Sequence, residues 1–269
     1  MQVRSPSSSS TEGAYTPPAP SSPSAINRTD PLLNIKLNHA RQTFDFVQRN
    51  LEVHAPLDKA SMTIWEAFEL IDMPDMLPMA LSVAEGCRST YPSQPWLHLV
   101  ALMAPLGHLL TLPAWGSQPN WVVDVESFPV GCRFSCKIAD HQYFSVNPDR
   151  RNRTYATDLG VYTSNCGLGA VYMSWSGSEY LHMILALNAT TLPHEALFIA
   201  RHQRHGALLR GGYRQFLDAR DEAALAWLTR YVQQSTVAAR VDDDRRLRSY
   251  YDGLVAQFFP NNANGVLRW

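Results

Sequence analysis

Apolar residues recur every three or four positions along most of this chain, and this spacing limits what it can fold into. The positions that follow it are Leu37, Ala40, Phe44 and Val47, then Ile64, Trp65, Phe68 and Ile71, and later Ala224, Leu225, Leu228, Tyr231 and Val232. Residues with this spacing lie on one face of an α-helix and pack against a core. We therefore expect an all-α fold, with short strands at most.

The start of the chain has a different composition. It is dominated by Ser, Pro, Thr and Ala, as in RSPSSSSTEGAYTPPAPSSPS. Such a segment cannot bury enough apolar surface to offset the entropy of ordering. A disordered tail is predicted for residues 1–30, followed by one helical domain over 31–269.

Two local features refine this expectation. Ser61 and Asp218 precede helical stretches and are plausible N-caps. Between about 113 and 167 the helical period stops, in a stretch rich in Pro, Gly, Asn and aromatic residues. Because so long a connector is uncommon in a compact domain, we expect this stretch to be ordered and packed.

Charge and hydropathy exclude several classes of partner. The net charge of -1 gives no basic footprint for nucleic acid or for an anionic membrane surface. No stretch reaches the roughly 18 to 20 apolar residues of a membrane span, and the first residues lack the apolar core of a signal peptide. A soluble, cytoplasmic protein is expected. Its four cysteines, with no CxxC pair, are expected to be free thiols: Cys87, Cys132, Cys136 and Cys166.

Several motifs resemble the inositol oxygenase family. The longest is NPDRRNRTYATDLGVYTSNCGLGAVYMSW over 147–175, and QTFDFV, FPVGCR (128–133) and the end from LRSYYDGL to LRW agree in order and spacing. The resemblance covers about 33–269. It implies a mostly helical domain of the HD-hydrolase type, whose central bundle in the family holds two iron ions and cleaves the inositol ring with dioxygen.

The same resemblance implies that the iron ligands are gone. The six aligned positions carry Met79, Ala104, Pro105, Gly177, Gln203 and Ser235. A one-residue shift of the alignment would place His202 at this position instead of Gln203 and would restore a single iron ligand. Iron of this class needs imidazole nitrogens and carboxylate oxygens, so we expect no metal and no cofactor.

Pro105 lies in LVALMAPLGH (99–108), a stretch that otherwise resembles a buried helix. A proline inside a helix costs about 3 kcal/mol or more. One interpretation is that the lost carboxylate position accepted a residue that bends the helix and frees the carbonyl of Ala101. The other is that Pro105 lies near the end of the helix.

Departures at the aligned polyol-binding positions argue against inositol as the ligand. A roomier, drier cavity for a lipophilic molecule is predicted instead. Its expected lining is Met79, Met103, Ala104, Pro105, Trp175 and Gly177. Core packing is the alternative role for the methionines.

Four polar residues are candidates for catalysis. Glu126 could act as acid or base, or be a solvated loop carboxylate, and His108 could donate a proton or be structural. Gln203 and Ser235 could hydrogen-bond a substrate carbonyl. Arg201, Arg204 and His205 form a basic run that is expected to be a solvated helix face. Cys132 is expected to be a framework residue.

Two functions remain open. The first is a repurposed, metal-independent enzyme acting on a hydrophobic small molecule, such as a secondary-metabolite precursor. It would catalyse an isomerisation or cyclisation, including a pericyclic one, by positioning a conformer and polarising one carbonyl. The alternative is a pseudoenzyme that serves as a binding or regulatory module, which an exposed apolar patch would favour and a closed cavity would oppose. The oligomeric state stays open.

Overall fold

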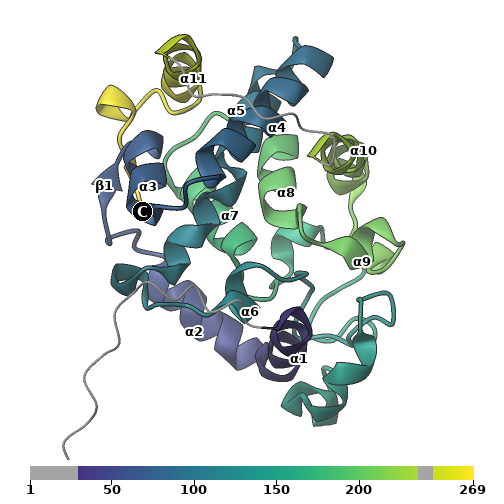
Figure 1. Cartoon of the computed structure of the whole chain (residues 1–269). Helices are drawn as coiled ribbons and strands as arrows, with labels where there is room; N and C mark the ends of the chain where they lie inside the picture. The colour runs from purple at the N-terminus through teal and green to yellow at the C-terminus, as the bar shows by residue number, and fades with distance from the viewer. Residues whose placement is uncertain (1–29, 236–244) are drawn as a thin grey trace, which may run out of the picture.

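A computed structural model describes residues 30–235 and 245–269, which form a bundle of helices with one very small sheet (Figure 1). The all-α prediction is confirmed. The tail predicted for residues 1–30 lies, apart from Asp30, outside the described residues.

The longer helices are α1 (Pro31–Arg41), α2 (Phe44–His54), α3 (Ile64–Ile71), α4 (Met76–Thr90), α5 (Pro95–Met103), α7 (Gly177–Leu187), α8 (His194–His202), α10 (Ala219–Ser235) and α11 (Arg245–Phe258). Short α-helical turns are α6 (Asn120–Val123) and α9 (Gly206–Leu209). The 3₁₀ helices are η1 (Ala104–Thr111), η2 (Pro113–Trp115), η3 (His141–Val146), η4 (Pro148–Arg151), η5 (Leu168–Ala170), η6 (Arg214–Phe216) and η7 (Ala263–Gly265).

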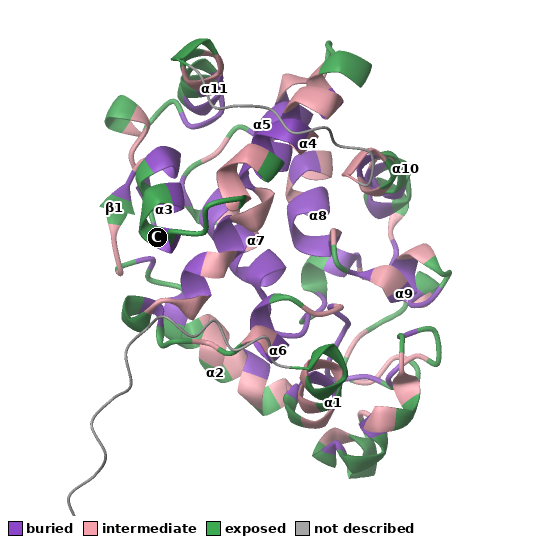
Figure 2. Ribbon diagram, in the orientation of Figure 1, coloured by how far each residue is buried: buried purple, intermediate pink, exposed green. Residues whose placement is uncertain are grey.

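Helices α5, α7 and α8 form the centre of the bundle. Helix α5 packs against α4, α8 and α11, while α7 packs against α8 and η1, and α10 covers α8 and α4. Figure 2 shows that the buried residues concentrate on these central helices. All eight residues from Trp96 to Met103 are buried, which explains why this stretch lacks a polar face.

Pro105 stands where the α-helix ends. Helix α5 stops at Met103, and the chain continues directly into the 3₁₀ helix η1, in which Pro105 is the second residue. A proline is tolerated in the first turn of a helix because its missing N–H would have no partner there. Of the two interpretations, the structure supports Pro105 at a helix end.

Helix caps confirm one prediction and correct another. Asp218 accepts hydrogen bonds from the backbone N–H groups of Arg220 (2.8 Å) and Asp221 (2.9 Å), as an N-cap does. Ser61 is not the cap of α3: Thr63 is, in a capping box with Glu66. Ser61 instead lies in β1.

The apolar period around residues 37–47 covers two helices. It crosses a break at Gln42 and Thr43, where the Thr43 hydroxyl accepts a hydrogen bond from the N–H of Phe46 (3.2 Å) and starts α2. The periodic pattern did not show this break because the three- and four-residue spacing of apolar positions continues across it.

The segment between 113 and 167 is ordered and packed, as predicted, through short helical turns. Phe134 and Phe144 stack at 4.1 Å, and Phe128 meets Phe144 edge-on at 5.0 Å. His39 of α1 stacks on Phe144 at 4.1 Å. These aromatic contacts fix the segment to α1.

Two short strands, one near the start and one at the end of the described chain, form the small sheet. Ser61–Met62 (β1) pairs antiparallel with Leu267–Arg268 (β2). Trp269 is fully buried, and its indole N–H donates to the carbonyl of Met62 (2.9 Å).

All four cysteines are free thiols, as expected, and Cys132 is buried. In the two described ranges, no helix is both long and apolar enough to cross a membrane.

Candidate functional site

At the start of α7, Gly177 occupies one of the positions that the family resemblance assigns to an iron ligand. Backbone atoms of Gly107 lie directly beside it. Gly177 is the first residue of α7 and lies against Gly107 of η1. A Cβ on Gly107 would overlap the carbonyl group of Gly177, and a Cβ on Gly177 would stand 3.3 Å from both the Gly107 carbonyl carbon and Val123 Cγ1. The two glycines therefore let η1 and α7 touch where a side chain would otherwise stand.

The residues predicted to line one apolar cavity line neither of the two cavities described below, and their role in binding stays a prediction. Met103 and Trp175 are fully buried, Ala104 and Pro105 are half-buried, and Met79 is 66% exposed. Met103 and Trp175 belong to the hydrophobic packing of the protein, which was the alternative role for the methionine.

Gln203 and Ser235 each bind within the protein. The Gln203 amide donates to the carbonyl of Ala200 (3.3 Å) and accepts from the Tyr231 hydroxyl (3.4 Å). The Ser235 hydroxyl donates to the carbonyl of Val232 (2.9 Å). Their use as donors to a substrate carbonyl stays a prediction.

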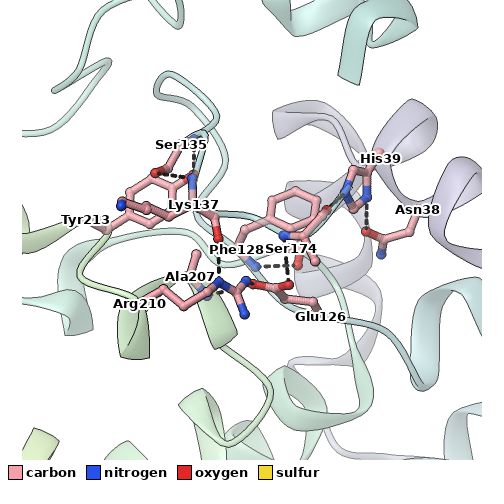
Figure 3. A network of polar contacts seen from close by, with 11 residues as sticks. Asn38, His39, Glu126, Phe128, Ser135, Lys137, Ser174, Ala207, Arg210 and Tyr213 are labelled. Carbon is pink, nitrogen blue, oxygen red and sulfur yellow. Dashed lines mark hydrogen bonds and ion pairs between the residues drawn. The ribbon is translucent and has the colours of Figure 1, made fainter. Parts of the chain in front are cut away.

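Glu126 lies at the centre of a polar network (Figure 3). Its carboxylate accepts hydrogen bonds from the N–H groups of Ala207 (2.6 Å) and Ala139 (3.1 Å) and forms an ion pair with Arg210. The Arg210 guanidinium also donates to the carbonyl of Lys137 (2.7 Å). Glu126 thereby ties three segments of chain together, and with three donors it is not a freely solvated loop carboxylate.

The smaller cavity, of about 360 Å³, lies beside this network, between α1 and residues 124–126. Glu126 and Asp124 line it together with His39. Burial lowers the pKa of His39, and its Nε2 is 2.8 Å from the carbonyl oxygen of Ala139. This cavity therefore contains one of the four predicted catalytic residues, Glu126.

His108 is held by two contacts. Its Nδ1 lies 2.9 Å from the carbonyl oxygen of Pro105, and its Nε2 lies 3.1 Å from the Asp124 carboxylate. Asp124 also pairs with Arg204 at 2.9 Å. Burial opposes ionisation of Asp124, but the contacts with His108 and Arg204 outweigh it and lower its pKa.

The basic run at the end of α8 is not a solvated face. Arg204 is exposed as expected, but His205 is fully buried and Arg201 is only 7% exposed. The Arg201 guanidinium binds both carboxylate oxygens of Glu179 at 2.7 Å and donates to the carbonyls of Leu168 and Val171 (both 2.9 Å). Such a two-pronged pair satisfies a charge that would be costly to bury alone.

This buried pair was missed at the sequence level. Its signal was the position of Arg201 directly after the apolar run LFIA, where a solvated face would have offered polar neighbours. Asp221 was missed too: it is buried and accepts from the N–H of Leu168 (2.6 Å). All three charged groups hold the 168–171 turn and α8 together.

The larger cavity, of about 790 Å³, is formed by the irregular segment and the chain after α9. Its apolar and aromatic lining comes from Phe134, Leu159, Tyr155 and Tyr213, and its polar lining includes Arg133, Ser135, Cys136, Lys137, His141, Asp149, Arg150, Asp158 and Gln215. Its volume lies within the range of about 300–1,000 Å³ found for sites that bind small organic molecules.

Comparison with known proteins decides the family. The family model described as myo-inositol oxygenase matches residues 33–269. Inositol oxygenase 4 of Arabidopsis thaliana is 37% identical over 248 residues, 87% of this chain and 77% of that protein. Inositol oxygenase of Rattus norvegicus is 35% identical over 248 residues, 87% of this chain and 85% of that protein.

The chain belongs to the inositol oxygenase family. A probable inositol oxygenase of Oryza sativa is similar as well, at 36% identity over 249 residues, 87% of this chain and 79% of that protein. The all-α, HD-type architecture expected from the resemblance is thus confirmed. These relatives are named as enzymes, so the chain is a member of an enzyme family.

The residues of this member of the inositol oxygenase family do not fit its iron ions. Ala104, Pro105 and Gly177 carry no donor group, and Met79 is exposed. No group of three or more His, Cys, Asp or Glu side chains able to hold a metal occurs within 30–235 or 245–269. The shift to His202 would supply one imidazole, whose ring is buried between Phe198 (4.5 Å) and His205 (5.5 Å).

Proposed function

We propose that this chain works without metal on a lipophilic small molecule. The observation that carries the proposal is that Gly107 packs against Gly177, at a position aligned with an iron ligand of the family. Ala104 and Pro105, at two further such positions, also have no side-chain atom that could bind iron. Because iron of this class needs imidazole and carboxylate ligands, the family's di-iron chemistry has no ligand set here. The fold, in contrast, keeps a cavity of organic-molecule size elsewhere.

The reaction we propose is an isomerisation or cyclisation of one substrate, including a pericyclic one. Such a reaction neither adds nor removes atoms and needs no redox partner. Holding a reactive conformer against the aromatic walls contributes through orientation. A hydrogen bond to one carbonyl contributes where charge develops. Tyr155, whose ring also lines the larger cavity, offers a hydroxyl donor for that role.

The second candidate is a pseudoenzyme that binds a ligand or partner without converting it. The observation that favours it is that all four residues predicted to be catalytic are already engaged within the protein. Both ring nitrogens of His108 and both carboxylate oxygens of Glu126 have partners. The side chains of Gln203 and Ser235 are engaged as well.

Deletion of the gene in its native host, followed by mass spectrometry of extracts, tests the two candidates. A missing product and an accumulating precursor of the same mass would support an isomerase or cyclase. Purified protein treated with a chelator should then convert that precursor. A requirement for added iron would contradict metal independence, and an unchanged metabolite profile would favour the pseudoenzyme.

A further inference from the structure

We infer that the larger cavity recognises an amphiphilic organic acid, whose anionic group meets Lys137 and Arg150 while its apolar body lies on the aromatic walls. This inference rests on the proposed function and deepens it, because it names the class of small molecule.

In the part of the chain that the structure describes, two of the three permanent cations lining the cavity have no anionic partner. Arg133 pairs with Asp158 at 3.0 Å, and both side chains are largely exposed. Lys137 and Arg150 form no ion pair within the described residues, although both residues line the cavity. Two positive charges are therefore available to an anion.

One further carboxylate, that of Asp149, lines the cavity. Asp149 accepts a hydrogen bond from the N–H of Phe44 (2.7 Å) at the first turn of α2. Its side chain is thus directed toward the positive end of that helix. Within the described residues, Asp149 forms no ion pair with Lys137 or Arg150, so neither cation is paired directly.

Aromatic and aliphatic side chains supply the other half of the site. Phe134 is buried in a stack with Phe144, so its ring is a rigid wall. Tyr155 is packed at 5.3 Å against Phe44. The ring of Tyr213 is held because its hydroxyl accepts from the N–H of Ser135 (2.9 Å). An apolar body can be desolvated on such walls, while the cations that line the cavity favour a negatively charged group on the ligand.

Three lining residues, Gly212, Ser135 and Lys137, pack closely together. A Cβ on Gly212 would stand 3.2 Å from the Ser135 hydroxyl and 3.3 Å from Lys137 Cβ. Figure 3 shows Ser135, Lys137 and Tyr213 grouped on one side of the Glu126–Arg210 pair. Arg210 also holds the carbonyl of Lys137, so the backbone that carries this cation is fixed. The Lys137 side chain therefore starts from a fixed backbone position beside the cavity.

Two dyes of one ring system test the inference. Anilinonaphthalene sulfonate carries an anionic group, and N-phenylnaphthylamine is its uncharged counterpart. We expect the sulfonate to bind more tightly, with one dye per chain. Lys137→Ala and Arg150→Ala should each weaken its binding by roughly three- to tenfold, the range of a partly exposed charge pair, and leave the neutral dye unaffected.

Arg151→Ala is the matched control, since Arg151 is an exposed arginine next to Arg150 that does not line the cavity. Its affinity for the sulfonate should equal that of the unmodified protein. Decanoate should displace the sulfonate more effectively than decan-1-ol. Thermal unfolding of each variant should be unchanged, because the replaced side chains are exposed.

The outcomes separate the inference from the proposed function. Equal binding of both dyes, unaffected by Lys137→Ala and Arg150→Ala, would overturn the organic acid and leave a neutral lipophile as ligand. Binding of neither dye would contradict a lipophilic ligand in this cavity and with it the proposed function. A loss in Arg151→Ala as large as in Arg150→Ala would show nonspecific surface attraction and overturn the inference.

Discussion

Gly107 and Gly177 meet backbone to backbone, 70 positions apart in the chain, at one of the positions where the family resemblance expects an iron ligand. Their contact joins η1 to the first turn of α7. The absence of two side chains is thus a structural feature of this protein, and it has consequences for stability that can be measured.

Gly107→Ala is expected to destabilise the protein by at least about 2 kcal/mol, because the added methyl group overlaps the backbone of Gly177 and overpacks the contact. Chemical denaturation measures the free energy of unfolding. Gly253→Ala is the control: a Cβ at this position of α11 meets nothing within 4 Å, and replacing a helical glycine should be neutral or stabilising by up to about 1 kcal/mol. Equal effects of both variants would contradict the close contact.

Iron should be present in the purified protein at well under one ion per chain, and inositol should not be consumed. The reason is the residue set at the former ligand positions, which offers neither imidazole nor carboxylate groups. Elemental analysis and an inositol turnover assay check this, with the rat inositol oxygenase as the positive control. Stoichiometric iron together with turnover would refute the proposed metal independence.

The buried pair of Arg201 and Glu179 is expected to be costly to break on one side only. Arg201→Met should lower the free energy of unfolding by about 3–5 kcal/mol, because it leaves the Glu179 carboxylate buried without a counter-charge. Asp158→Asn, which removes a charge from the exposed pair with Arg133, should cost less than about 1 kcal/mol. Denaturant titration measures the loss in free energy of unfolding for both variants. Similar losses would contradict the expected penalty for leaving Glu179 buried without a counter-charge.

Acidic pH should destabilise the protein through its buried histidines. Burial lowers the pKa of His205 to about 3 and holds that of His202 well below its usual value. The unfolded chain therefore binds protons first as the pH falls below about 6.5, so each histidine can remove up to about 1.4 kcal/mol of stability per pH unit. Urea midpoints at pH 7, 6 and 5 measure this slope.

His205→Phe provides the matched variant. Neither ring nitrogen of His205 has a partner in the described part of the chain, so the replacement removes a titrating group without leaving a donor or acceptor unmatched. Its dependence on pH should be shallower than that of the parent protein. An unchanged slope would show that His205 does not contribute.

Glu126→Gln should destabilise the protein by about 1–3 kcal/mol, since the new amide places a donor beside groups that already donate. Glu52→Gln, at an exposed position of α2, should have no measurable effect. Thermal unfolding separates the two variants. If turnover of the eventual substrate is lost at a temperature where Glu126→Gln remains folded, Glu126 has a catalytic role beyond this structural one.

Local patterns in the sequence predicted the helices well. Residues 64–71 and 224–232 repeat their apolar positions at helical spacing, and both form helices, because this spacing depends only on neighbours along the chain. Cap assignment was less reliable. Thr63 replaces Ser61 as the cap of α3 because it is three residues before Glu66, with which it forms the capping box.

The candidate site was predictable in one respect only. The residue types alone show that Ala104, Pro105 and Gly177, at positions aligned with iron ligands of the family, have no side-chain atom that could bind iron. The residues predicted to line an apolar cavity line neither of the two cavities described, and the backbone of Gly107 occupies the space beside Gly177. A missing side chain can leave a cavity or allow two elements to approach, and the sequence does not distinguish these results.

What the sequence by itself determined is therefore the helical class, the family and the absence of an iron ligand set, since each depends on residue type or on spacing between neighbours. Only the tertiary structure decided that Arg201 is buried with Glu179, that Gly107 closes the position of Gly177, and that the large cavity lies beside Lys137 and Arg150. These relationships join residues far apart in the chain. They arise when elements pack, because burial selects partners through geometry and charge rather than through order in the sequence.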